Sequence, residues 1–147
     1  MARLFLVRHA ESEGNRDRVF TATPHVPLTE RGRAQARATA AWLDANHRPG
    51  RIVSSPFARA RETADIIGGR LQLPVAIEED LRERDYGLLA GLPYATPRSD
   101  YDPLRYWLWR PEGGRAWSRW PPGSARCSTG WPPSRLRTTS SSFATAP

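Results

Sequence analysis

An arginine and a histidine stand side by side directly after a short apolar segment near the start of the chain. Leu4–Val7 is a run of four apolar residues, which predicts a short buried strand, and Arg8 and His9 follow it. Open α/β sheets build their ligand sites at the carboxyl ends of strands. Arginine offers a planar fork of donors to phosphate oxygens, and histidine acts as a nucleophile or proton carrier near neutral pH. The pair therefore indicates phosphoryl chemistry, with two merely solvated side chains as the alternative.

A second arginine stands in a related position further along the chain. Arg51–Ser54 is predicted to form another short strand, and Ser55-Pro56 supplies a cap residue and a proline suited to the first helical position. Arg59 then lies in the first turn of a helix, where free backbone N–H groups attract anions. We expect the two strands to bring Arg8, His9 and Arg59 to one edge of a sheet. An exposed arginine on the helix surface is the alternative for Arg59.

Strands and helices are expected to alternate around these residues, which is typical of a parallel sheet with helices on its faces. The sequence therefore predicts an α/β fold. Thr29 suits the N-cap of the first long helix, and Arg61 and Glu62 are expected to be solvated. The predicted elements after Leu4–Val7 are a loop over Glu11–Leu28, a helix from Thr29 to about Ala45, a strand over Arg51–Ser54, a helix with apolar positions at Phe57, Ala60, Ala64 and Ile67 that Gly68-Gly69 ends, a strand over Val75–Ile77, and a turn-rich connection over Leu81–Gly91.

Composition limits the possible classes of protein. A chain of 147 residues is expected to hold one domain with a real core. It has 22 Arg and no Lys, and the excess charge is uneven, because residues 1–114 contain 17 Arg and all 15 acidic residues whereas residues 115–147 contain 5 Arg and no acid. We therefore do not expect nucleic-acid binding from the basic charge. The single Cys127 suggests a reducing cytoplasm, and no segment predicts a signal peptide or a membrane span.

Four motifs follow one another in order over about 90 residues: Leu6–Asn15, Pro27–Gly32 with Gln35-Ala36, Ser54-Ser55-Pro56 through Thr63-Ala64, and Leu81–Gly87. Together they resemble the histidine phosphatase superfamily, which has the phosphoglycerate mutase-like fold. The resemblance implies that His9 attacks phosphorus and becomes a phosphohistidine. It implies that Arg8, Asn15 and Arg59 bind the phosphoryl oxygens, and that Glu83 is the general acid that protonates the leaving alcohol.

This allocation of roles makes chemical sense. A covalent intermediate divides a difficult reaction into two easier steps, and fixed cations stabilise the charge that a phosphoryl transition state spreads over its oxygens. The resemblance implies a three-layer α/β/α sandwich with a mostly parallel central sheet, a small phosphorylated substrate, no metal and no cofactor. A surface carboxylate paired with Arg82 or Arg84 is the alternative for Glu83.

The resemblance ends at Gly114, so we divide the chain into a histidine phosphatase-like portion over 1–114 and an atypical tail over 115–147. The family continues with Gly-Gly-Glu-Ser, a helix, and a buried strand that ends in a second pocket His-Gly. The tail instead contains three Trp, five Pro and seven Ser, with no acid and no His. The phosphate pocket is therefore expected to lack one wall and the sheet a central strand.

A shift of reading frame explains this departure. When the gene is read one base earlier after Gly114, the Gly-Gly-Glu-Ser motif reappears, and codons for Trp, Cys and Ser give apolar residues at helical spacing. Residues 140–143 become four apolar residues, and the codons after them permit His-Gly. We therefore expect the tail to be irregular and out of frame. A genuine Trp- and Arg-rich tail is the alternative.

Three hypotheses for function remain open. The first is a phosphomonoester hydrolase that acts through phosphohistidine, with phosphoglycerate mutase-type transfer as its variant. The second is a truncated, non-catalytic chain that lacks the second pocket histidine. The third is a binding module whose Arg- and Trp-rich tail stacks on a single-stranded nucleic acid or grips an acidic partner. Neither the substrate nor the oligomeric state follows from the sequence.

Overall fold

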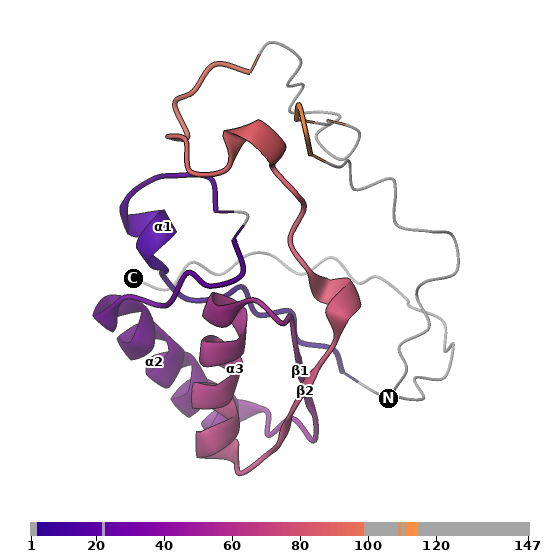
Figure 1. Cartoon of the computed structure of the whole chain (residues 1–147). Coiled ribbons are helices and arrows are strands. Elements are labelled where there is room, and N and C mark those ends of the chain that lie inside the picture. Colours follow the sequence, from indigo (N-terminus) through magenta and orange to yellow (C-terminus); the bar gives the residue numbers. More distant parts are fainter. Residues whose placement is uncertain (1–2, 22, 99–108, 110, 115–147) are drawn as a thin grey trace.

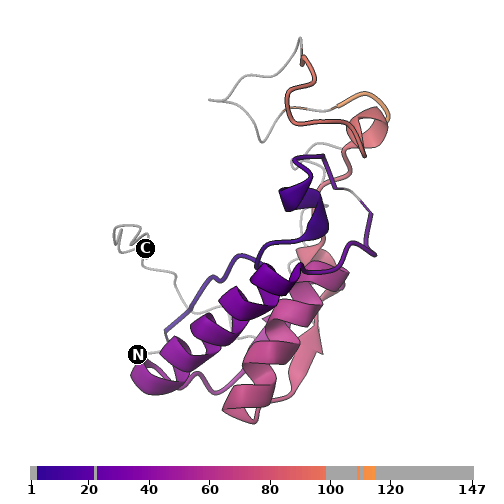
Figure 2. The same ribbon diagram turned by 90° about the vertical axis from the view of Figure 1, so that its left-hand side faces the viewer.

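Two long helices lie side by side on one side of a small parallel sheet (Figures 1 and 2). The computed structural model describes residues 3–21, 23–98, 109 and 111–114. Helices α2 and α3 pack against each other, and α3 connects the two strands of the sheet. The elements are α1 (Glu13–Arg16), α2 (Glu30–Asn46), β1 (Ile52–Ser54), α3 (Ala58–Leu71), β2 (Val75–Ile77), and the short 3-10 helices η1 (Glu79–Leu81) and η2 (Gly87–Leu89).

The predicted strand–helix–strand unit is confirmed. Strands β1 and β2 pair in parallel, with Ile52 opposite Val75 and Ser54 opposite Ile77. Parallel strands run in the same direction, so the chain must return to the starting end of the sheet before the second strand begins. A helix is the usual crossover, because a tight turn can join only antiparallel strands. The described residues thus contain one helical layer and part of the sheet of the expected sandwich.

Helix α2 begins where the sequence predicts. The hydroxyl of Thr29 accepts a hydrogen bond from the backbone N–H of Gly32 at 3.0 Å, so it satisfies one of the free donors of the first turn. The buried face of α2 meets α3 in a core formed by Ala40, Leu43 and Ile67, with Phe5 packed against it. Small residues on α2 allow the two helix backbones to approach closely.

The bounds of α3 differ from the prediction at both ends. The helix begins at Ala58, after an uncapped Phe57, rather than at Pro56. It also continues through Gly68 and Gly69 to Leu71, and it ends at Gln72 in the left-handed conformation. Gly68 is inside the helix, and the segment that follows the helix passes close to it. A Cβ atom on Gly68 would meet the carbonyl oxygen of Leu73 at 2.7 Å. This glycine permits a close approach and does not end the helix.

The predicted strand over Leu4–Val7 is wrong for the described structure. This segment is not in a strand, and Leu4 and Leu6 are 57% and 90% exposed. A strand is held by backbone hydrogen bonds to a neighbour, and among the described residues no such bond reaches Leu4–Val7. Only Phe5 of this run packs on the core. The apolar pattern predicts a buried strand correctly only where a partner strand is present.

The region between Glu11 and Leu28 is mostly loop, as predicted, with the single turn of α1 inside it.

Among the helices of the described residues, none combines the length and the apolar character that crossing a lipid bilayer requires.

Two adjacent glycines of α3 provide a paired test of this packing. We expect Gly68→Ala to destabilise the protein by about 1–3 kcal/mol, because the new methyl group would lie 2.7 Å from the carbonyl oxygen of Leu73 and 3.0 Å from the side chain of Val75. Gly69→Ala, whose Cβ atom would meet nothing within 4 Å, is expected to stabilise by about 0.5–1 kcal/mol. Urea unfolding measures both free energies. Equal effects of the two substitutions would contradict the close approach at Gly68.

Candidate active site

The ring of His9 makes a hydrogen bond through each nitrogen. Nδ1 lies 2.8 Å from the carbonyl oxygen of Ala10, and Nε2 lies 3.2 Å from Nε of Arg59. A carbonyl oxygen only accepts and an arginine N–H only donates, so the two contacts require the same tautomer. Nδ1 carries the proton and donates it to Ala10, and the lone pair is on Nε2. His9 and Arg59, separated by 50 positions in sequence, are thus brought into direct contact as predicted.

Arg59 is a buried arginine held by backbone carbonyls. Its side chain is only 3% exposed. Besides the contact with His9, its terminal nitrogens donate to the carbonyl oxygens of Thr23 at 3.5 Å and Thr21 at 3.4 Å. The guanidinium carbon lies 5.0 Å from the centre of the Phe57 ring. Arg59 is therefore buried beside His9, and the alternative of an exposed arginine on the helix surface is wrong. A role for Arg59 in phosphate binding stays a prediction.

The surroundings of His9 favour its neutral form. Burial of the ring lowers the pKa of His9 from its ordinary value, and the nearby cations Arg59 and Arg8 lower it further. The hydrogen bond to Ala10 and the carboxylate of Glu83 act in the opposite direction, but the net pKa is lowered. Burial likewise lowers the pKa of Arg59. The Nε2 of His9 therefore carries an unprotonated lone pair at neutral pH, as a nucleophile must, and this lone pair accepts the N–H of Arg59.

His9 and Arg59 open onto a cavity of about 1010 Å³. Exposed Arg8 and half-buried Glu83 line the same cavity. Its other walls are apolar residues of the segment before Arg8, the strand β1 and the buried face of α3, together with Ser54 and Ser55 at the end of β1.

Glu83 is not the surface ion pair that the alternative supposed. Its carboxylate accepts the backbone N–H of Arg84 at 2.9 Å, and it forms no ion pair with the described residues. The neighbouring Arg82 pairs with Glu79 instead, and Arg84 stacks over the ring of Trp109. Glu83 therefore lines the cavity without the ion pair that the alternative supposed.

Asn15 takes a different place. Its side-chain oxygen accepts hydrogen bonds from the N–H and the hydroxyl of Ser12 at 3.1 and 3.0 Å, which closes the cap of α1. Its amide nitrogen lies 3.5 Å from the hydroxyl of Tyr94. Asn15 does not line the cavity that contains His9. A role for Asn15 in phosphate binding stays a prediction.

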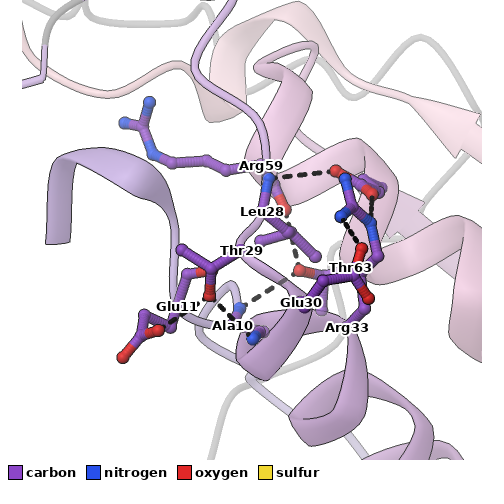
Figure 3. Close-up of polar contacts among 10 residues, drawn as sticks. Ala10, Glu11, Leu28, Thr29, Glu30, Arg33, Arg59 and Thr63 are labelled. Atoms are coloured by element: carbon purple, nitrogen blue, oxygen red, sulfur yellow. Dashed lines mark hydrogen bonds and ion pairs between the residues drawn. The ribbon is translucent and has the colours of Figure 1, made fainter. Parts of the chain in front are cut away.

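Two residues of α3 make hydrogen bonds to the segments around the site, and neither was assigned a role from the sequence. Figure 3 labels Thr63 and the contacting residues Leu28 and Arg33. Glu62, expected to be solvated, accepts the N–H of Leu28 at 3.0 Å and pairs with Arg33 of α2 at 2.6 Å. It therefore ties the loop before α2 to both helices. Arg61, in contrast, is exposed as predicted.

Thr63 is the second missed residue, and it connects the two halves of the site. It is 4% exposed, and its hydroxyl bonds the backbone of Ala10 and of Arg59. The available signal was its position four residues after Arg59, on the same face of the helix.

No obvious metal site accompanies these residues. Within residues 3–21, 23–98, 109 and 111–114, the His, Cys, Asp and Glu side chains form no group of three or more that could hold a metal ion.

Comparisons with known proteins agree with this geometry. The chain is 38% identical over 93 residues to the uncharacterized phosphatase PhoE of Bacillus subtilis (strain 168), a match that covers 63% of this chain and 48% of that protein. It is 37% identical over 112 residues to the 2,3-bisphosphoglycerate-dependent phosphoglycerate mutase of Bifidobacterium longum (strain DJO10A), covering 74% of this chain and 46% of the mutase. The chain thus spans about half the length of these relatives.

A solved structure also resembles this one. The structure of a mycobacterial glucosyl-3-phosphoglycerate phosphatase in complex with VO3 matches with a TM-score of 0.64 and 33% identity, over 74% of this chain and 54% of that one. The sequence profile of the histidine phosphatase superfamily (branch 1) matches residues 4–125. With this match and the phosphoglycerate mutase-like α/β fold, the chain belongs to the histidine phosphatase superfamily.

Proposed function

We propose that this protein is a phosphomonoester hydrolase that acts on a small phosphorylated metabolite through a phosphohistidine at His9. The observation that carries the proposal is the neutral imidazole of His9, whose Nε2 lone pair lies 3.2 Å from the guanidinium of Arg59 at the wall of a cavity. A nucleophile beside a fixed cation suits an anionic phosphoryl group, because the cation binds the oxygens that gain charge in the transition state.

The reaction proceeds in two steps. In the first, the Nε2 lone pair of His9 forms a bond to phosphorus, the ester P–O bond breaks, and Glu83 gives its proton to the leaving alkoxide. Arg8 and Arg59 hold the equatorial oxygens. In the second, Glu83 takes a proton from water as the water oxygen attacks phosphorus, and the P–N bond breaks to release phosphate and His9. Substrate binding must draw the Nε–H of Arg59 away from Nε2, and phosphoryl oxygens are the stronger acceptors that can do so.

Hydrolysis is favoured over a mutase reaction. The connection between Glu83 and Gly114 is short, so little chain is available to cover and retain a bisphosphorylated intermediate. The similarity to a phosphoglycerate mutase is the observation that favours the mutase reaction. Turnover of a phosphomonoester with water as acceptor, compared with transfer to a second hydroxyl of a bisphosphorylated substrate, decides between them. We further propose that the reaction needs no metal and takes place in the cytoplasm.

We also propose that residues 1–114 are the histidine phosphatase-like portion and that the gene is out of frame over 115–147. The cavity supports this proposal, because apolar residues of Leu4–Val7 and of β1 face the same open space, and β1 pairs with β2 along one edge only among the described strands. A further apolar strand in this space would cover the apolar residues of both segments. Resequencing the gene across codon 114 tests the frame, and an unchanged reading would end this proposal.

Labelling tests the phosphohistidine. Incubating the full chain with a ³²P-labelled alkyl phosphomonoester, followed by a rapid quench, is expected to give an alkali-stable, acid-labile label that His9→Asn abolishes. His25→Asn, which changes an exposed histidine, is the matched control and should keep the label. If only a chain with the restored frame is labelled, the chain as written is the truncated, non-catalytic form. Absence of label on the restored chain as well would refute the proposal.

The role of Glu83 is tested by the leaving group. We expect Glu83→Gln to lower turnover of an alkyl phosphate by roughly 10²–10⁴-fold, because an alkoxide needs a proton to leave. Turnover of 4-nitrophenyl phosphate should fall far less, since that leaving group is stable without a proton. Glu13→Gln removes an exposed carboxylate of α1 and serves as the control. Equal losses with both substrates would show that Glu83 is not the proton donor.

A further inference from the structure

We propose that Thr63 is the positioning residue of this site, and that its hydroxyl fixes both the orientation of His9 and its distance from Arg59. The inference rests on the function proposed above for its effect on turnover. Its structural part, the link between Thr63 and the tautomer of His9, stands independently.

The hydroxyl of Thr63 makes two hydrogen bonds to two distant parts of the chain (Figure 3). It accepts the backbone N–H of Ala10 at 3.1 Å. It also donates to the carbonyl oxygen of Arg59, one helical turn earlier, at 2.7 Å. The residue is 4% exposed, so water does not substitute for either bond. One oxygen atom therefore joins the backbone next to His9 to the backbone of Arg59.

The bond to Ala10 reaches the imidazole through a single residue. The N–H of Ala10 is held by Thr63, and the carbonyl of Ala10 accepts the Nδ1 proton of His9 at 2.8 Å. Holding the N–H of Ala10 restricts the backbone at this residue, and we infer that this restriction helps to keep its carbonyl directed at the ring. That carbonyl selects the tautomer that leaves the lone pair on Nε2. A hydrogen bond to one ring nitrogen commonly sets the protonation of the other nitrogen in this way.

The bond to Arg59 closes the arrangement. Nε of Arg59 donates to Nε2 of His9 at 3.2 Å. The chain of contacts therefore runs from Thr63 through Ala10 to His9, on to the side chain of Arg59, and back through the Arg59 carbonyl to Thr63. Because every member of this closed ring has a partner within it, a displacement of one member moves the others.

A purely structural role is the competing explanation. Threonine in a helix often bonds the carbonyl four residues earlier without any effect on function. In that case the loss of the hydroxyl lowers stability only. The bond to the N–H of Ala10 is what predicts an additional effect on the imidazole of His9.

The test compares Thr63→Val, which replaces the hydroxyl with a methyl group of similar size, with Thr63→Ser, which keeps it. Thr29→Val is the control, since the Thr29 hydroxyl caps α2 and bonds the side chain of Glu11 but is not hydrogen-bonded to Ala10, His9 or Arg59. Nitrogen-15 NMR of the full chain, with the three histidines assigned through His25→Gln and His47→Gln, reports the tautomer of His9. Single-turnover phosphorylation reports its reactivity.

We expect wild type, Thr63→Ser and Thr29→Val to show His9 protonated at Nδ1 above its pKa, and Thr63→Val to show a mixture of both tautomers. The phosphorylation rate of Thr63→Val should fall roughly 10–100-fold with KM nearly unchanged, because orientation is lost while the phosphate-binding groups remain. Thr63→Ser should recover most of the rate.

An unchanged His9 tautomer in Thr63→Val, or an equal change in Thr29→Val, would overturn the inference and leave Thr63 a structural residue. If Thr63→Val alters the tautomer but wild type and the frame-restored chain never phosphorylate His9, the positioning role of Thr63 stands and the proposed function fails.

Discussion

The hydrogen bond from Nδ1 of His9 to the carbonyl of Ala10 determines which ring nitrogen carries the lone pair. An imidazole without such a partner distributes its proton over both nitrogens, and only one of them faces Arg59 and the cavity. Burial and the cations Arg59 and Arg8 then lower the pKa of the ring, so that this nitrogen is unprotonated near neutral pH. Tautomer and charge are thus set by the fold before any substrate arrives.

Helix α3 supplies most of what this arrangement needs. Three of its residues within five positions reach three different partners: Arg59 contacts His9, Glu62 holds the loop before α2, and Thr63 holds the backbone at Ala10. Because α3 also packs along α2 and connects β1 to β2, its position is fixed by the core. A rigid helix with several polar anchors is a more accurate support than a loop, which explains how a site divided between distant segments keeps its geometry.

Local patterns in the sequence predicted much of the fold. The cap at Thr29 and the paired strands β1 and β2 followed from residue types and spacing. The cap depends on neighbours close in sequence, and the parallel pairing follows from the alternation of strands and helices. Arg8, His9 and Arg59 line one cavity, although the strand expected to present Arg8 and His9 does not form among the described residues.

What the sequence did not predict depends on contacts between distant segments. Leu4–Val7 has the pattern of a buried strand, but among the described residues no strand pairs with it. Glu62 has the pattern of a surface residue, yet it accepts a backbone N–H from a loop 34 positions earlier. Gly68 resembles a helix end, but it admits the returning chain at Leu73. Pattern alone does not reveal which backbone group a polar side chain will meet.

A structure of the full chain, or of its frame-restored form, with vanadate as a mimic of the phosphoryl group tests the central claim most directly. The account predicts vanadium bonded to Nε2 of His9, with Nδ1–H still donating to the Ala10 carbonyl and the guanidinium of Arg59 turned to the vanadate oxygens. Vanadate bound through Nδ1, or bound away from His9 with Arg59 still donating to Nε2, would contradict it.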